Sequence, residues 1–208
     1  LASGEVTTVA GGLGAGFVDG DLSGSKFNSP KGLFVIKQGT GLVEVIVADT
    51  GNHVIRRINE ASNVHWVLTI AGTPQSAGIS PTTGVTCMAG AGGMRFNSPE
   101  DVFVRTTFLS LASDPSHYYD MFIADTGNHA IVGLRYAVQN ALPLGTFACN
   151  GKRIAGSGVA GYAEGGGGTT PAPPVQFNSP TAVVALNYES GGQAAGPFSY
   201  TDIPYLLV

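Results

Sequence analysis

Charged side chains are scarce in this sequence of 208 residues and make up only 12% of it. Globular domains commonly hold about twice that share. The ten lysines and arginines form no basic stripe, and fourteen acidic residues leave a net charge of -4. Because clustered basic side chains are what hold a phosphate backbone, we expect no nucleic acid partner.

Long apolar runs are missing as well. No run approaches the roughly 18 residues that cross a bilayer. The first residues also lack the charged, apolar and small-residue segments of a signal peptide. We therefore expect no direct membrane insertion by this segment.

Glycine and proline, in contrast, are abundant, with 31 and 12 residues. Hydrophobic residues make up 43% of the sequence, which at this length predicts one packed domain rather than a disordered chain. Such a composition favours many turns and few solvated helices.

Four short motifs recur in the same order along the chain. They are Phe-Asn-Ser-Pro at 27–30, 96–99 and 177–180; Ala-Asp-Thr-Gly-Asn-His at 48–53 and 124–129; an apolar residue with Ala-Gly at 9–11, 70–72 and 154–156; and a glycine-flanked acidic motif at 16–20 and 161–165. Between these motifs, β-branched and aromatic residues gather in short runs, at 32–36, 42–48, 54–58 and 64–70 in the first unit. Each unit therefore predicts four strands, and tandem four-stranded antiparallel units are typical of β-propeller blades.

The motifs Phe-Asn-Ser-Pro, Ala-Asp-Thr-Gly-Asn-His-Val-Ile-Arg-Arg-Ile and Thr-Ile-Ala-Gly, taken together, resemble the NHL-repeat family of β-propellers. The resemblance covers nearly the whole chain and is specific because four elements recur in register. It implies an all-β fold, a β-propeller of four-stranded antiparallel blades that is incomplete in this chain. The units here are longer than is usual in the family. The second unit also has Val132 and Gly133 where the first has Arg56 and Arg57.

The repeats divide the chain into four parts of one propeller domain. We expect 1–26 to be the end of a preceding blade with its crossing, and 27–95 to be a blade with a long crossing. We expect 96–176 to be a blade with an insertion between its first two strands and a Gly/Pro-rich crossing, and 177–208 to be the first strands of a further blade. A third hexapeptide is expected just after the last residue, so we expect the sequence to be part of a longer polypeptide.

The repeated hexapeptide is the foremost candidate site, since it contains an acid, a hydroxyl and a histidine. It can be read as a catalytic pair, Asp49 with His53. It can also be read as a turn in which the carboxylate accepts backbone N–H bonds while glycine and asparagine adopt positive φ. A catalytic group needs one tuned environment and is rarely repeated, so we interpret the motif as structural. The structural motif residues are Asp49, Thr50, Gly51, Asn52, His53, Asp125, Thr126, Gly127, Asn128, His129, Phe27, Pro30, Phe96, Pro99, Phe177 and Pro180.

The remaining candidate ligands do not form a metal site in the sequence. His65 lies in a predicted outer strand and His117 in an insertion, and neither has a partner at a ligand spacing. Asp19 and Glu164 lie beside glycines, and their spacing lacks a full calcium ligand set. We therefore expect no catalytic residue, metal or cofactor in this segment.

Insertions between the first and second strands are candidate interaction loops, because binding residues concentrate on loops of rigid scaffolds. They span 109–119 and 188–203 and contain Tyr118, Tyr119, Phe198 and Tyr200. Such aromatic residues anchor protein interfaces, or else they cover the edges of their own blades.

The two cysteines permit one disulfide. On a propeller, Cys87 would lie in a crossing on one face, and Cys149 near the start of an outer strand, toward the other face. This geometry disfavours a direct bond between them.

Three functional classes remain open. The first is a non-catalytic structural scaffold or protein–protein interaction module, assembled with other subunits or with further blades of the same polypeptide. The alternative is a propeller lyase or hydrolase with its metal site in blades outside this sequence. RNA binding, which some NHL proteins perform, fits the acidic charge least. The low charge and the Thr/Pro crossing at 169–174 favour an extracellular or cell-surface location.

Overall fold

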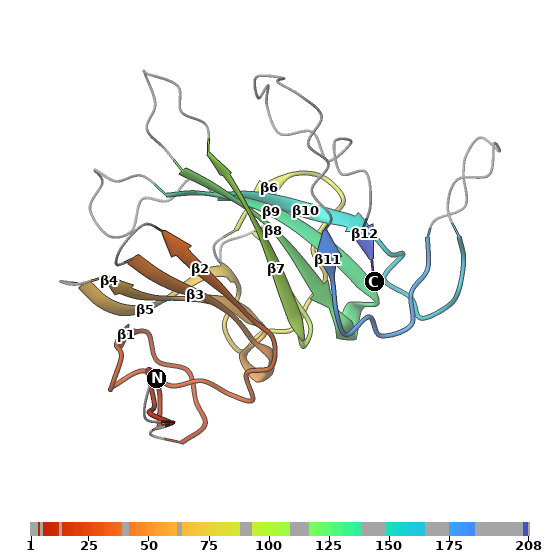
Figure 1. Cartoon of the computed structure of the whole chain (residues 1–208). Coiled ribbons are helices and arrows are strands. Elements are labelled where there is room, and N and C mark those ends of the chain that lie inside the picture. The colour runs from red at the N-terminus through yellow and green to blue at the C-terminus, as the bar shows by residue number, and fades with distance from the viewer. Residues whose placement is uncertain are drawn as a thin grey trace.

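A computed structural model of the chain shows an arrangement of β-strands (Figure 1). It describes residues 4, 6–12, 14–38, 42–61, 64–87, 93–108, 117–138, 149–164, 175–185 and 206–207. Over these ranges, all the strand pairings are antiparallel, and short 3-10 turns are the one kind of helix. The all-β prediction is confirmed.

The first sheet corresponds to the first repeat. Its strands are β1 Gly20–Asp21, β2 Leu33–Gln38, β3 Leu42–Asp49, β4 Val54–Ala61 and β5 Val64–Gly72. They lie in the order β1-β5-β4-β3-β2. The runs rich in β-branched residues are therefore the strands, as their composition predicts.

The second sheet repeats this pattern. Its strands are β6 Val85–Thr86, β7 Asp101–Phe108, β8 His117–Asp125, β9 Ala130–Val138 and β10 Cys149–Ala155, in the order β6-β10-β9-β8-β7. A third sheet pairs β11 Val184–Ala185 with β12 Leu206–Leu207. Propeller blades are confirmed, and the described sheets do not close into a ring.

Each full sheet has one strand more than the four that the sequence predicts. The additional strands, β1 and β6, come from the crossing that precedes each unit, and they pair with the outer strands β5 and β10. A crossing therefore runs along the outer edge of the blade that follows it.

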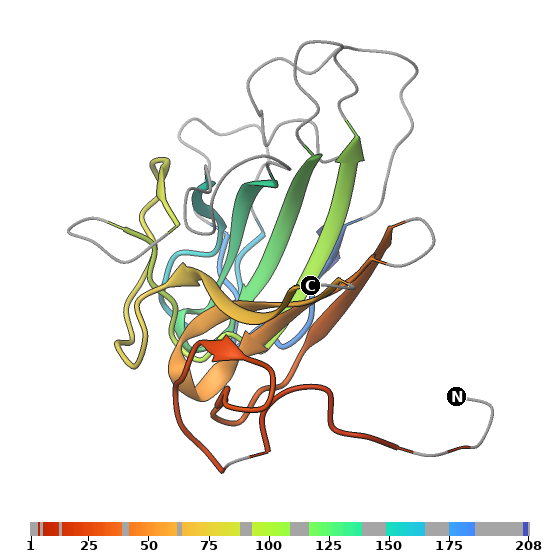
Figure 2. The ribbon, with the colours of Figure 1, turned by 90° about the vertical axis from the view of Figure 1, so that its left-hand side faces the viewer.

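The inner strands of successive units are neighbours: β2 lies beside β7, and β7 beside β11 (Figures 1 and 2). Phe34 on β2 and Phe103 on β7 meet edge to face, with 5.3 Å between ring centroids. The largest buried cluster fills the space between the first and second sheets, and a smaller one lies between the second sheet and β11. Leu33 and Val35, on the other face of β2, are 58% and 53% exposed.

Candidate functional site

The repeated hexapeptide connects the second and third long strands of each full sheet. Asp49 ends β3, a 3-10 turn η1 covers Thr50–Asn52, and β4 begins after His53. In the second sheet Asp125 ends β8, η2 covers Thr126–Asn128, and β9 follows His129. The predicted turn is present in both units.

The residue that adopts positive φ in this turn is the histidine. His53 has φ 59° and His129 has φ 50°, whereas Gly51 and Asn52 lie in the 3-10 turn. The prediction that glycine and asparagine take these positions is wrong. The turn is closed by a single left-handed residue at its end, where a 3-10 turn passes into a strand.

Glycine is required in the turn for another reason, which is space. A Cβ atom on Gly51 would lie 2.6 Å from Cγ of Asn28, and one on Gly127 would lie 2.7 Å from Cγ of Asn97. The Gly51 amide donates to the Asn28 carbonyl at 2.8 Å. The Asn28 side chain donates back to the Gly51 carbonyl at 3.2 Å. The turn is thus pressed against the Phe-Asn-Ser-Pro motif of its own unit.

The Asp49 carboxylate is fully buried and accepts hydrogen bonds from three donors. Its Oδ1 accepts the backbone N–H of Asn28 at 2.8 Å. Its Oδ2 accepts the side-chain amide of Asn52 and Nη1 of Arg56, both at 2.8 Å. The predicted bond from a backbone N–H to this carboxylate is therefore present. A buried carboxylate with these partners is a structural anchor rather than an exposed acid.

The second copy keeps the amide donors and lacks that arginine. Asp125 accepts the backbone N–H of Asn97 at 2.7 Å and the side-chain amide of Asn128 at 2.7 Å. Val132 is at the position of Arg56. Burial raises the pKa of Asp125 to about 7, against the lowering effect of both hydrogen bonds and of the Arg153 charge.

The turn also reaches the Phe-Asn-Ser-Pro motif of the next unit. Thr50 Oγ1 donates to the Pro99 carbonyl at 2.7 Å, and His53 Nδ1 accepts the backbone N–H of Ser98 at 3.0 Å. In the second copy Thr126 donates to the Pro180 carbonyl at 2.7 Å, and His129 accepts the Ser179 N–H at 3.0 Å. Each hexapeptide therefore ties two consecutive units together, and its histidine nitrogen is occupied as an acceptor.

The serine of Phe-Asn-Ser-Pro has an unusual backbone that the sequence did not reveal. Ser29, Ser98 and Ser179 have φ of 49°, 50° and 51°. A non-glycine residue in this region is strained by roughly 1 to 3 kcal/mol and persists where its surroundings hold it. For Ser98 and Ser179, the bond to histidine is one such restraint.

The crossing that precedes each unit is held to the corner by the asparagine. Asn52 donates to the Gly16 carbonyl at 2.8 Å, and Asn128 donates to the Gly78 carbonyl at 2.6 Å. The amides of Gly16, Gly78 and Gly161 donate to the carbonyls of Phe27, Phe96 and Phe177, all at 3.0 Å. Gly78 is thus the second-unit equivalent of Gly16 and Gly161, although the acidic motif that follows them is absent from the sequence after Gly78.

Arg56 binds this crossing to the first unit. Its side chain is fully buried between the rings of Phe17 and Phe27, 4.9 and 4.7 Å from their centroids. It pairs with Asp19 at 2.7 Å as well as with Asp49. The sequence analysis did not assign a role to this arginine. The sequence signal for its site is Phe17 and Asp19 in the crossing, together with an arginine seven residues after Asp49.

Asp19 therefore has a structural environment rather than a calcium-like one. It accepts the backbone N–H and the hydroxyl of Thr69 at 3.1 and 3.2 Å. Glu164 accepts the Tyr162 hydroxyl at 2.7 Å. His65 is an exposed residue of β5, and His117 is the first residue of β8. Among the described residues, no three His, Cys, Asp or Glu side chains gather in a metal-binding group.

The aromatic loop residues divide into two groups. Tyr118 and Tyr119 belong to β8, so the predicted loop 109–119 extends too far. Tyr119 is 1% exposed and stacks on Tyr136. Its side chain is therefore not an exposed interaction anchor, and the alternative that it covers its own blade fits the structure. Phe198 and Tyr200 lie outside the described residues, as does the whole of 188–203.

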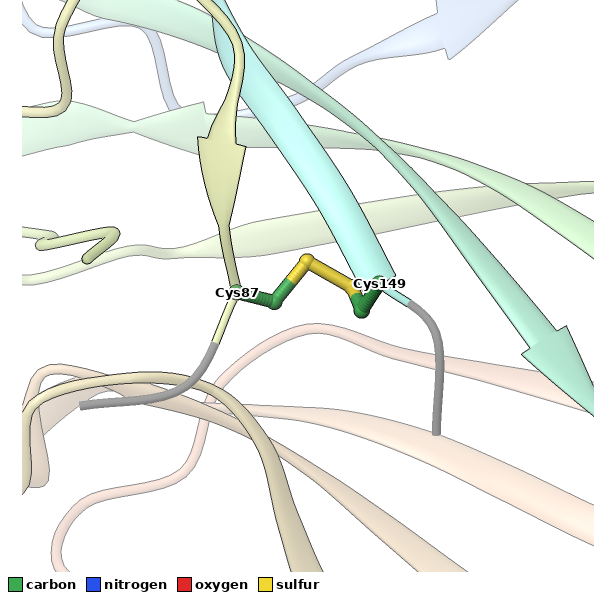
Figure 3. Close-up of a disulfide and its surroundings, with 2 residues drawn as sticks. All are labelled: Cys87 and Cys149. Atoms are coloured by element: carbon green, nitrogen blue, oxygen red, sulfur yellow. A yellow bond between two sulfur atoms is a disulfide. The ribbon is translucent and has the colours of Figure 1, made fainter. Parts of the chain in front are cut away.

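Cys87 and Cys149 form a disulfide, which the sequence analysis disfavoured (Figure 3). The two residues lie side by side because β6 runs along the outer edge of β10, where Thr86 faces Asn150. The Cα atoms are 5.3 Å apart, and the Cys87 amide donates to the Cys149 carbonyl at 3.3 Å. The crossing that contains Cys87 does not stay on one face of the propeller, as predicted, but runs along the edge of the next blade.

The fold and the repeated corner define a β-propeller built from hexapeptide-linked blades. NHL repeat-containing protein 2 of Gallus gallus is 33% identical to this chain over 162 residues, which cover 76% of the chain and 20% of that protein. The chain thus spans about a fifth of the length of the curated relative it matches. This similarity supports the resemblance of the chain to the NHL-repeat family.

No family model and no solved structure matches the chain. In the part of the chain that the structure describes, no helix has the length and apolar character needed to cross a membrane.

Proposed function

We propose that this chain is part of a non-catalytic NHL-type β-propeller that acts as a structural scaffold and protein-interaction module in a larger assembly. The observation that supports this most is the use of the hexapeptide. Its acid is buried against amide donors, and its threonine and histidine bond the next unit. Asp49 and His53, the residues that most resemble a catalytic pair, thus form hydrogen bonds within the corner and to the next unit.

A general acid or base must reach its substrate with a proton to give or a lone pair to receive one. The Asp49 carboxylate is 0% exposed, and His53 Nδ1 already accepts the N–H of Ser98. The same arrangement occurs at Asp125 and His129. This repetition supports a role in architecture.

We further propose an extracellular or cell-surface setting. The disulfide between Cys87 and Cys149 supports it, because disulfides persist in oxidising compartments and are rare in the cytosol. The test is alkylation of the protein in its native source before any reductant is added. We expect both thiols to resist alkylation until the protein is reduced, and labelling without reductant would contradict this setting.

The non-catalytic role is tested by metal analysis of the purified, folded protein. We expect no stoichiometric metal to remain after dialysis. One Zn²⁺ or Ca²⁺ per chain would contradict the proposal and favour a metal-dependent propeller enzyme.

The interaction role is tested by native mass spectrometry of the protein taken from its source. We expect a complex of defined stoichiometry whose partner dissociates when residues 110–116 or 189–202 are replaced by a short glycine-serine linker. A partner that stays bound to both variants would remove these insertions as the binding surface.

A further inference from the structure

An open pocket lies where the crossing at 161–164 meets the third Phe-Asn-Ser-Pro motif. We define the third repeat as this crossing together with the unit that begins at Phe177. The pocket corresponds to the place where the first repeat buries Arg56. The pocket has a volume of about 620 Å³ and is lined by residues of two segments, 161–164 and 175–178. Tyr162, one of the lining residues, is 85% exposed.

These two segments have the backbone of the arginine site in the first repeat. Val18 and Lys26 form an isolated antiparallel bridge, and so do Ala163 and Gln176. The amides of Gly16 and Gly161 each donate to a phenylalanine carbonyl, that of Phe27 or Phe177, at 3.0 Å. Tyr162 and Glu164 therefore correspond to Phe17 and Asp19.

In the first repeat, the corresponding backbone arrangement surrounds the side chain of Arg56. The Arg56 guanidinium lies between the Phe17 and Phe27 rings and pairs with Asp19. Its Nη1 and Nη2 donate to the carbonyls of Lys26 and Val18, at 3.0 and 2.8 Å. Two aromatic rings, a carboxylate and two carbonyls thus surround the cation.

The second repeat shows the alternative, in which the arginine and its partners are replaced together. Val132 stands for Arg56, Ile79 for Phe17 and Pro81 for Asp19. The backbone bridge is also changed there, because the Ser80 hydroxyl donates to the Arg95 carbonyl at 2.6 Å and takes up that acceptor. The ring at the Phe17 position, the acid and the bridge therefore accompany the arginine and are missing in the second repeat, which keeps Phe96 in place of Phe27.

We propose that the pocket formed by Tyr162, Glu164 and Phe177 binds an arginine guanidinium, presented by a β-hairpin with the sequence Asp-Thr-Gly-Asn-His-x-x-Arg. The third repeat has the aromatic rings, the acid and the bridge of the first repeat rather than the apolar set of the second. A guanidinium between two rings and beside a carboxylate gains from cation–π and charge-assisted contacts, which an aliphatic side chain cannot make. The inference depends on the comparison of repeats and not on the proposed scaffold role.

The test uses a cyclic peptide that copies residues 45–58 of this chain, closed at the point where Val45 faces Ile58 across β3 and β4. The peptide is titrated into the 208-residue protein, and the amide resonances of 161–164 and 175–177 are followed by NMR. We expect saturable shifts at these amides, and roughly tenfold weaker binding when the peptide carries valine in place of its first arginine.

The matched variant on the protein is Glu164→Gln, a substitution at an exposed position that removes the negative charge and keeps an oxygen that can accept the Tyr162 hydroxyl. We expect it to weaken the arginine peptide about tenfold and to leave the valine peptide unchanged. Equal binding of both peptides, or no shift at these amides, would overturn the proposal. Shifts that follow protein concentration without peptide would assign the pocket to a second copy of the chain and would also overturn it.

Discussion

The corners of the first and second repeats form the same backbone bonds but compensate their buried carboxylates differently. Asp49 pairs with Arg56 at 2.8 Å, whereas Asp125 has Val132 at that position and is left with two amide donors. The bonds that tie one unit to the next are nearly identical, at 2.7 Å from each threonine and 3.0 Å to each histidine.

The outer edges of the two blades are also held by different contacts. In the first blade, Asp19 holds the crossing to β5 through Thr69 and to β4 through Arg56. In the second blade, the disulfide between Cys87 and Cys149 closes the same edge. The hydrogen bonds that join one unit to the next are thus the same in both repeats. The partner of the buried carboxylate and the contact that holds the outer edge differ between them.

The largest effect is expected from Arg56→Val, which gives the first corner the side chain of the second. It leaves Asp49 buried without its cation, and breaking a buried ion pair costs about 3 to 5 kcal/mol. Urea denaturation measures the free energy of unfolding. Adding Asp49→Asn to this variant should recover part of the loss. A loss below about 1 kcal/mol for Arg56→Val alone would show that the arginine is dispensable.

A pH dependence should come from the second corner. The pKa of Asp125 is about 7 in the folded protein and near 3.8 when unfolded. Between these values the folded state holds a proton that the unfolded state has released. The free energy of unfolding should therefore fall as pH rises from about 4 to 7, by up to about 4 kcal/mol.

The control for this dependence is Asp125→Asn, which cannot titrate at that position. Urea denaturation at intervals between pH 4 and pH 8 should show a shallower slope for this variant than for the wild type. Equal slopes would contradict the assignment of the dependence to Asp125.

Removing the disulfide should destabilise the second blade by about 2 to 4 kcal/mol, because the bond closes a long loop between residues 62 apart in the sequence. The variant Cys87→Ser with Cys149→Ser is compared with the oxidised protein by urea denaturation. We also expect faster hydrogen exchange in β6 while β1, the matching strand of the first blade, is unchanged. Unchanged stability would mean that the β6 to β10 pairing holds the edge alone.

The smallest effects should come from Thr50→Val and Thr126→Val. Each leaves a proline carbonyl of the next unit without its donor, which costs about 1 to 3 kcal/mol. The two losses should be similar because the two bonds have the same length, 2.7 Å. A difference larger than about 1 kcal/mol would show that the joints are not equivalent.

The sequence could predict the long strands and the turn, since both depend on local patterns. Runs of β-branched and aromatic residues mark the strands from β2 to β5, and the repeated hexapeptide marks the corner between β3 and β4. The bond from the Asn28 amide to Asp49 was also expected in kind, as an aspartate that accepts a backbone N–H in a turn.

The remaining features depend on how units lie against one another, which no single unit encodes. The additional strands β1 and β6 have two residues each, too few to form such a run. The disulfide and the bond from Thr50 to Pro99 join residues that meet only after the crossing has passed along the next blade. The left-handed histidine was missed because glycine and asparagine are the usual residues at positive φ.

The role of the hexapeptide as a joint between units is tested most directly by hydrogen exchange in the variant Asp49→Ala. Amide exchange is followed by NMR at Asn28 and Ser98, which bond the first corner, and at Asn97 and Ser179, which bond the second. We predict faster exchange at Asn28 and at Ser98, in the next unit, with far less change at Ser179. Wild-type protection at both Asn28 and Ser98 would contradict the account.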